Sequence, residues 1–287
     1  MRIPAIHEGS VIGREHIRLW KNNQDGEKTG SVTVGEKTYY FGFVSDGCSG
    51  GANNEVGSRL IVSYLISEVS MMIAMGAKLE TIPDQLFNRA VGYFRSIASL
   101  TCVGDPRQIV DFIKHHLLCT VIGFIMNDED LIIFSAGDGI IVVNDKVTQI
   151  DQNNTPKYLA YHLLDRQYLK LQDGELPQTF ETEVYDVKAV NKFAICSDGI
   201  TEGAISHLWG HKHPLGVERR LKVLVNQKIE PFFDDCTAIV VEFVEEKSDA
   251  KTNAGDGTIE ATDNDSLEVS DGPLELTDNE VKGVLKK

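Results

Sequence analysis

Apolar residues recur along this chain with two different spacings, and the spacing predicts its elements. Between residues 31 and 41 they flank the turn Gly35-Glu36, which predicts a β-hairpin. From Glu55 to Met75, and again from Pro83 to Leu100, they recur every three or four residues, which predicts two helices. Asp105-Pro106 is a typical helix start, so a third helix is expected there.

Beyond residue 118 the pattern becomes strand-like. Dense apolar runs at 119–126, 131–134 and 140–143 predict three short strands that form an antiparallel meander. Further strands are expected at 180–185, 192–196 and 236–243, a short helix at 156–164, and a longer helix at 215–225. The folded part of the chain is therefore expected to contain both helices and strands.

The composition changes near residue 245. Residues 245–287 hold 12 acidic and 5 basic residues and no aromatic residue, so they cannot bury enough apolar surface to offset the entropy of ordering. We expect a folded domain over residues 1–244 and a disordered acidic tail over 245–287. The tail is most simply a solvated spacer, with its last seven residues as a candidate docking peptide.

Overall composition excludes several classes of protein. The chain has 287 residues, 42% of them hydrophobic, and a net charge of -15, which argues against a nucleic-acid-binding surface. No apolar run reaches the roughly 18 residues of a membrane span, and the N-terminus lacks an apolar signal core. Five cysteines without a Cys-x-x-Cys pair fit reduced thiols. A cytoplasmic protein that binds neither membrane nor nucleic acid is expected.

Acidic residues stand at the ends of several predicted strands. Val44-Ser45-Asp46-Gly47 and Cys196-Ser197-Asp198-Gly199 each place an Asp-Gly pair directly after an apolar run. Three further acids occupy comparable turn positions: Asp25 in an early polar loop, Asp138 between two apolar runs, and Asp234 just before the last strand. Taken singly, each of these acids is explained as a turn or cap residue.

Together, the five acids indicate a metal site. Carboxylates that face one cleft repel each other, and cations must offset their charge. The histidines show no metal-ligand pattern, and oxygen-rich sites suit hard ions such as Mg²⁺ or Mn²⁺. Two such ions lower the pKa of a bridging water and polarise a phosphoryl group, which predicts a metal-dependent phosphoester hydrolase.

The same motifs, in this order and spacing over roughly residues 10 to 244, resemble the protein phosphatase type 2C family, in particular its bacterial-type branch. The set consists of Gln24-Asp25, Val44-Ser45-Asp46-Gly47, Ala136-Gly137-Asp138, Ser197-Asp198-Gly199 and Asp234-Asp235-Cys236-Thr237. The resemblance implies an α+β fold: a four-layer αββα sandwich of two mostly antiparallel sheets flanked by helices. It also implies two Mg²⁺ or Mn²⁺ ions at one end of the sandwich, and a third, weaker ion.

The resemblance assigns a role to each acid. Asp46 would bridge two metals and position the attacking water, Gly47 would contribute its carbonyl oxygen, and Asp198 and Asp234 would bind the first metal. Asp25 would act close by, directly or through water, and Asp138 would hold the third ion with Asp198. A hydroxide bridging the metals would attack the phosphorus of phosphoserine or phosphothreonine in a protein substrate, which would reverse the action of a Ser/Thr kinase.

Two departures from the family pattern bear on the site, the first on phosphate binding and the second on the hydrogen bonding of Asp138. Where the family often has a phosphate-binding arginine shortly before Asp25, this chain has Trp20 and Lys21, with Arg18 further away. Arg18 and Lys21 are therefore the candidate phosphate ligands. Gly139 replaces a usual serine after Asp138, and residues 151–178 coincide with the variable flap that would shape substrate choice.

Two other functions stay open. The missing arginine and the acidic tail favour a catalytically weak, phosphatase-like binding or regulatory module. Alternatively, a phosphatase of the same fold would act on a small phosphoester. Cys48, Cys196 and Cys236 lie beside the acids and are interpreted as small core residues, with a redox-sensitive site as the less favoured interpretation.

Overall fold

The computed structural model describes residues 2–102, 105–152, 156–165, 176–227 and 232–245, all within one compact unit, Met1–Glu246. The strands are β1 (Arg2–Val11), β2 (Gly26–Val34), β3 (Lys37–Ser45), β4 (Val121–Met126), β5 (Asp130–Ala136), β6 (Gly139–Val143), β7 (Lys146–Ile150), β8 (Glu181–Asp186), β9 (Lys192–Cys196) and β10 (Cys236–Glu245). The helices are α1 (Arg14–Arg18), α2 (Glu55–Ala74), α3 (Ile82–Thr101), α4 (Pro106–His116), α5 (Glu202–Ile205) and α6 (Gly216–Gln227), with 3-10 turns at Leu79–Thr81, Leu159–Leu163 and Val187–Ala189. The predicted tail lies outside the described residues except for Glu245.

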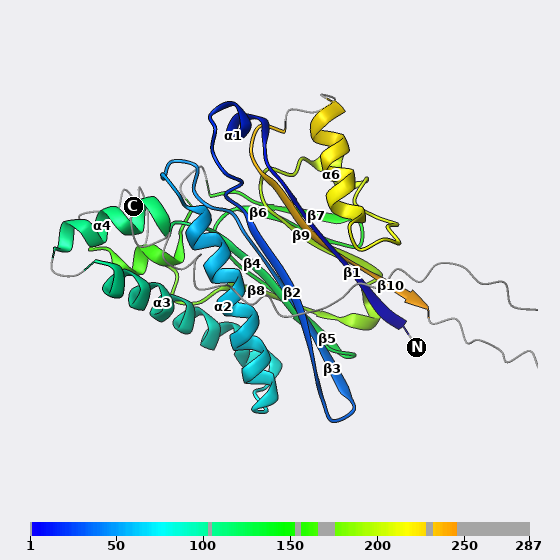
Figure 1. Ribbon diagram of the computed structural model, residues 1–287. Coiled ribbons are helices and arrows are strands. Elements are labelled where there is room, and N and C mark those ends of the chain that lie inside the picture. The colour runs from blue at the N-terminus through cyan, green and yellow to red at the C-terminus, as the bar shows by residue number, and fades with distance from the viewer. Residues whose placement is uncertain (1, 103–104, 153–155, 166–175, 228–231, 246–287) are drawn as a thin grey trace, which may run out of the picture. The chain divides into compact units, whose positions relative to one another are not determined.

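The strands form two five-stranded sheets in which every pairing is antiparallel. The first sheet has the order β1-β10-β9-β6-β7, and the second has the order β2-β3-β4-β5-β8. The two sheets are stacked, with α2, α3 and α4 covering the second sheet and α6 lying over the first (Figure 1). The expected αββα sandwich with mostly antiparallel sheets is confirmed.

Three apolar cores fill the spaces between these four layers. Between the sheets, Phe124 of β4 packs edge-on against Phe193 of β9, with ring centroids 4.9 Å apart. Successive residues of a strand face opposite sides, so in β3 Phe43 enters the core under the helices, whereas Val44 enters the core between the sheets. A third core joins the first sheet to α6 through Leu221 and its neighbours.

Helix α2 is the main helical cover of the second sheet and packs on β2 and β3. By length and composition alone it could also cross a membrane. Its apolar stripe, which includes Ile61, Leu65 and Val69, is buried in the core beneath it. Within the described unit, α2 is therefore accounted for as a core helix.

The predicted meander of three strands after residue 118 is wrong in its last strand. β4 and β5 pair as expected, but β6 pairs with β7 and β9 in the other sheet. The chain crosses between the sheets at Gly137-Asp138-Gly139, where both glycines have positive φ, 99° and 152°. This conformation, which side chains other than glycine rarely adopt, turns the chain out of the β5 plane and leaves Asp138 at the crossing.

Several short elements were not expected from the sequence. β1, β7, α1 and α5 are all present in the structure. β1 pairs along its whole length with β10, the last strand of the domain, so its pairing partner is distant in the chain. The predicted short helix at 156–164 appears as the 3-10 turn Leu159–Leu163, and residues 166–175 of the expected flap lie outside the described residues.

Candidate metal centre

Strand register brings the predicted acids to one end of the sandwich in two pairs. Asp25 precedes β2 and Asp46 follows β3, and the register pairs Gly26 with Ser45. Asp198 follows β9 and Asp234 precedes β10, whose neighbouring register pairs Ala238 with Cys196. Since each pair lies at the same end of adjacent antiparallel strands, residues far apart in the sequence become neighbours.

Asp46 is held by its backbone at the end of β3. Its N–H donates to the Oγ1 atom of Thr120 at 3.0 Å, and its carbonyl accepts from the Thr120 N–H at 2.8 Å. The next residue, Gly47, donates its N–H to the carbonyl of Gln24 at 3.2 Å. A Cβ atom at Gly47 would lie only 2.7 Å from that carbonyl oxygen, so glycine allows the Asp25 loop to approach Asp46.

Asp198 is presented in a matching way at the end of β9. Ser197 donates its N–H to the Thr237 carbonyl at 2.9 Å and accepts the Thr237 N–H on its Oγ at 3.0 Å. A Cβ atom at Gly199 would lie 1.9 Å from the carbonyl oxygen of Asp235, so this glycine permits close backbone contact with the loop before β10. The Asp-Gly motifs thus owe their glycines to tight packing between loops.

Asp25 is the most deeply buried acid of the group, with 3% of its surface exposed. Its Oδ2 atom accepts a hydrogen bond from the Ser197 hydroxyl at 2.9 Å, which joins the first pair of acids to the second. Its Oδ1 atom is buried and has no hydrogen-bond partner among the described residues. A buried carboxylate oxygen without a donor is costly, so a proton or a bound cation is required there.

The acids influence one another strongly. Burial, followed by the charges of Asp25 and Asp198, raises the pKa of Asp46 well above its ordinary value. Burial likewise raises the pKa of Asp25 and of Asp234, and repulsion from neighbouring carboxylates adds to both shifts. In the described part of the chain, no lysine or arginine forms an ion pair with these acids.

Asp138 lies beside this group. It is buried, accepts the Gln152 N–H at 3.1 Å, and has its pKa raised to about 6 by burial, with the charges of Asp198 and Asp151 adding to the shift. The structure therefore places Asp25, Asp46, Asp198, Asp234 and Asp138 in one electrostatically coupled cluster, which we call the acid cluster. Carboxylate donors, an orphaned Asp25 oxygen and uncompensated charge fit hard divalent cations such as Mg²⁺ or Mn²⁺.

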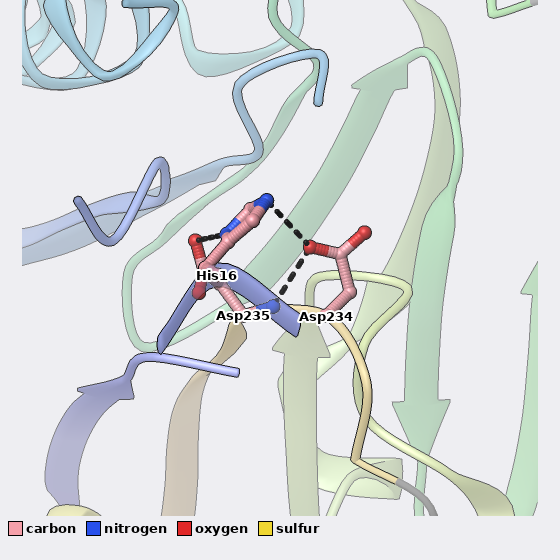
Figure 2. Close-up of side chains that lie close together, drawn as sticks. All are labelled: His16, Asp234 and Asp235. Carbon is pink, nitrogen blue, oxygen red and sulfur yellow. Dashed lines mark hydrogen bonds and ion pairs between the residues drawn. The ribbon is translucent and has the colours of Figure 1, made fainter. Parts of the chain in front are cut away.

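A second group, next to the acid cluster, consists of His16, Asp234 and Asp235 (Figure 2). The Nδ1 atom of His16 lies 2.8 Å from Oδ2 of Asp235, and its Nε2 atom lies 3.8 Å from Oδ1 of Asp234. The hydrogen bond to Asp235 raises the pKa of His16, although burial of the ring opposes that shift. His16 thereby connects the fully buried Asp235 to the half-exposed Asp234.

Asp235 differs from the acids of the cluster because both of its carboxylate oxygens accept hydrogen bonds from the protein. Besides His16, its Oδ2 accepts the Gln24 N–H at 2.6 Å, and its Oδ1 accepts the Gly13 N–H at 2.7 Å. These donors all come from the segment between β1 and β2. Asp235 therefore fastens that segment, which ends in Asp25, to the loop that carries Asp234.

Sequence reasoning did not single out His16 or Asp235. His16 is far from Asp234 in the chain and follows no ligand spacing, so no local signal identified it. Asp235 had a signal: two consecutive acids precede a buried strand, where successive side chains point to opposite sides. One of the pair faces the acid cluster and the other faces inward to the Gly13–Gln24 segment.

The two candidate phosphate ligands have different surroundings. The guanidinium of Arg18 pairs with Glu15, one turn away on the exposed side of α1. The ammonium of Lys21 donates to the Ser49 carbonyl at 2.6 Å, in the loop that follows Asp46. Lys21 also lines a pocket together with Asp234, whereas Arg18 does not, so the structure brings only Lys21 against the site.

Comparison with known proteins places these features in context. Residues 12–263 match a family model described as protein phosphatase 2C. The structure of the serine/threonine phosphatase Stp1 from Staphylococcus aureus is similar, with a TM-score of 0.54 and 12% identity over 85% of this chain and 96% of that one. The catalytic domain of the serine/threonine protein phosphatase PstP, in complex with two manganese ions, has a TM-score of 0.55 and 16% identity over 85% of this chain and 100% of that one. At these identities the likeness is one of fold, and no match is found among curated proteins.

Proposed function

The chain belongs to the protein phosphatase 2C family, and from that premise we propose that it hydrolyses phosphoserine and phosphothreonine in proteins with Mg²⁺ or Mn²⁺ bound at the acid cluster. One observation carries the proposal most directly. Asp25 and Asp46 are held together with Asp198 and Asp234 without a lysine or arginine ion pair in the described residues. Like-charged carboxylates in this arrangement favour divalent cations.

In this proposal the ligands are those that the family pattern suggests. Asp46 would bridge two ions, Gly47 would offer its carbonyl oxygen, and Asp198 and Asp234 would complete the first site. Asp25 would lie behind them, and Asp138 would share a third, weaker ion with Asp198. When bound, such ions would supply an acidified water and would polarise the phosphoryl oxygens.

The chain's own residues would set the geometry of that chemistry. Thr120 fixes the backbone of Asp46, and Ser197 directs one oxygen of Asp25, so the Asp46 backbone and that oxygen would already be in position when a phosphate enters. Lys21 would attract the phosphate dianion from the side of Asp234. Ser49, which holds the Lys21 ammonium, would keep that charge at the mouth of the site.

The cellular setting is proposed on the thiols. All five cysteines are free, which suits the reducing cytoplasm. There the protein would act on phosphoproteins and so oppose a Ser/Thr kinase.

The test compares hydrolysis of p-nitrophenyl phosphate and of phosphoserine peptides with Mn²⁺, with Mg²⁺ and with EDTA. Turnover is expected only with a metal, and Asp46→Asn should lower kcat by more than about 100-fold because the bridging carboxylate is lost. Asp145→Asn is the matched control, since it removes the same charge from a side chain that is 96% exposed. Full activity in EDTA would overturn the proposal.

The same assay separates the runner-up function. A catalytically weak binding module is favoured by the Arg18–Glu15 pair, which keeps that guanidinium occupied outside the pocket. Such a module would bind Mn²⁺ in calorimetry and capture a phosphopeptide but would turn over neither substrate. Turnover of p-nitrophenyl phosphate without any phosphopeptide hydrolysis would instead favour a small phosphoester as substrate.

A further inference from the structure

Trp20 has a conformation that its residue type disfavours. Helix α1 ends in a Schellman motif: the Lys21 N–H donates to the His16 carbonyl at 2.9 Å, and the Trp20 N–H donates to the Ile17 carbonyl at 3.3 Å. This motif puts Trp20 in the left-handed region, with φ of 57°. Glycine is the usual residue at this position because a side chain there is strained.

The Trp20 side chain does not pack against the rest of the described fold to offset this strain. The residue is 95% exposed, and none of the aromatic or cation–π contacts within the described residues involves it. The other tryptophan, Trp209, packs on the core beneath α6 and has the Lys192 ammonium 4.8 Å from its ring centroid. Folding therefore explains Trp209 but not Trp20.

A small pocket begins next to Trp20. Its volume is about 230 Å³, and the residues on either side of Trp20, Leu19 and Lys21, both line it. Phe233 and Asp234 line the pocket from the loop before β10. This volume is below the roughly 300–1,000 Å³ of pockets that enclose whole small ligands, and it suits a single side chain.

Two apolar side chains, Leu19 and Phe233, line the pocket together with the polar residues Glu15, His16, Lys21, Ser49 and Asp234. Leu19 is 48% exposed and Phe233 is 62% exposed, although both are large hydrophobic residues. The loop that carries Phe233 is bonded to the start of α1, the helix that precedes Leu19, because the Glu15 N–H donates to the Phe233 carbonyl at 3.0 Å. Leu19 and Phe233 thus form an exposed apolar rim beside Asp234 of the acid cluster.

We propose that Leu19, Trp20 and Phe233 form a docking surface for the polypeptide that flanks the phosphorylated residue of a protein substrate, with a bulky apolar side chain seated in the pocket. This inference rests on the proposed phosphatase function. A phosphate held at the acid cluster leaves the adjoining peptide over this rim, because Asp234 belongs to both. Lys21 lines the pocket beside the carboxylates of Glu15 and Asp234, and its positive charge would attract the phosphate of an anionic phosphopeptide.

Exposed tryptophan and rigid apolar neighbours are typical of interface residues that carry binding energy. The surface also offers a substrate-recognition element distinct from the 151–178 segment expected from the family pattern. A small phosphoester has no flanking side chain to place on this surface, whereas a peptide does. The change in the ratio of peptide turnover to p-nitrophenyl phosphate turnover on substitution of Trp20 or Phe233 therefore reports on this surface.

The experiment measures kcat/KM of the full chain with Mn²⁺ on three substrates: p-nitrophenyl phosphate, a phosphoserine peptide with leucine or phenylalanine next to the phosphoserine, and the same peptide with alanine there. Wild-type protein should prefer the apolar peptide. Trp20→Ala and Phe233→Ala should each lower the ratio of apolar-peptide to p-nitrophenyl phosphate kcat/KM about tenfold, mainly through KM. Trp20→Tyr should keep most of the wild-type ratio.

Two controls keep the result interpretable. Met75→Ala removes a side chain at the far end of α2 whose exposure (79%) lies between those of Phe233 and Trp20, and it should change neither value. Trp20→Gly relieves the left-handed strain, so its melting temperature should equal or exceed that of the wild type while its peptide ratio falls. Normal p-nitrophenyl phosphate turnover with unchanged ratios in Trp20→Ala and Phe233→Ala would overturn the docking surface alone. Absence of turnover of every substrate by wild-type protein would instead overturn the proposed function.

Discussion

Two buried carboxylates that lie close to each other in this protein, Asp235 and Asp25, are stabilised in opposite ways. Asp235 is 1% exposed, and each of its oxygens receives hydrogen bonds from the Gly13–Gln24 segment. Asp25 is almost as buried, at 3%, yet one of its oxygens has no donor among the described residues and its neighbours are other acids. The two carboxylates are almost equally buried, but hydrogen-bond donors of the protein satisfy both oxygens of Asp235 and only one oxygen of Asp25.

The difference separates a structural carboxylate from a functional one. A buried carboxylate whose oxygens accept hydrogen bonds from the protein can hold loops together. A buried carboxylate that faces other acids must take up a proton or a cation. Asp235 therefore serves the first purpose, and the acid cluster around Asp25 and Asp46 is suited to the second.

The largest expected effect on stability comes from removing the carboxylate of Asp235, whose oxygens are satisfied by hydrogen bonds. Asp235→Ala would leave the Gly13 N–H, the Gln24 N–H and the His16 ring without their acceptor, at a cost of about 3–5 kcal/mol in the free energy of unfolding. Urea unfolding followed by fluorescence measures this loss. Asp145→Asn again serves as the exposed control, and a loss below about 1 kcal/mol in Asp235→Ala would show that this carboxylate is not the fastening point.

Removing a carboxylate from the acid cluster should change the stability of the metal-free protein in the opposite direction. In EDTA, Asp46→Asn removes a repelled carboxylate, so the metal-free variant should be more stable than wild type by about 1 kcal/mol, or roughly 2–4 °C in melting temperature. Thermal unfolding at about pH 8 measures the change. A variant less stable than wild type without metal would mean that Asp46 is compensated by the protein after all.

The two regions also predict a pH dependence. Folding raises the pKa of Asp46, Asp25 and Asp234, and that of Asp138 to about 6, so the folded protein binds more protons than the unfolded chain. The contribution of these four acids to the stability of the metal-free protein is therefore fully present below the ordinary aspartate pKa and is lost as pH rises through the raised values.

Melting temperatures in EDTA should accordingly be higher at about pH 5.5 than at about pH 8. Mn²⁺ should raise the melting temperature more at the higher pH, because protons no longer compete for the carboxylates. Asp46→Asn should flatten the pH dependence in EDTA, which separates the acid cluster from the effect of the chain's overall negative charge. An equal Mn²⁺ effect at both pH values would contradict this account.

The smallest expected effect concerns the thiols beside the acids. Burial raises the pKa of Cys119 and of Cys196 to about 12, and Cys236 is also buried with a raised pKa, so these thiols should resist iodoacetamide in the native protein. Mass spectrometry should find labels only on Cys48 and Cys102, which are partly exposed, with or without Mn²⁺. Labelling of Cys196 in EDTA alone would reveal that the metal-free acid cluster opens.

Much of the fold followed from local patterns in the sequence. Apolar spacing predicted α2, α3 and most strands within a few residues, because helical and strand periodicity each repeat over short distances. The Asp-Gly pairs after β3 and β9 could be identified for the same reason, since a strand end and its turn are local. Their gathering at one end of the sandwich rested on resemblance to a family, and strand register supplies the physical basis.

What the sequence determined by itself is the set of acids and the elements that carry them. Only the tertiary structure decided that β6 joins the other sheet, that both oxygens of Asp235 are satisfied while one oxygen of Asp25 is not, and that Trp20 stands exposed between two residues that line a pocket with Asp234. The reason is that partners decide each outcome, and those partners are distant in the chain. Asp234 and Asp235 are the same residue type one position apart, and only the donors brought from Gly13, His16 and Gln24 make one a structural anchor and leave the other facing the acid cluster.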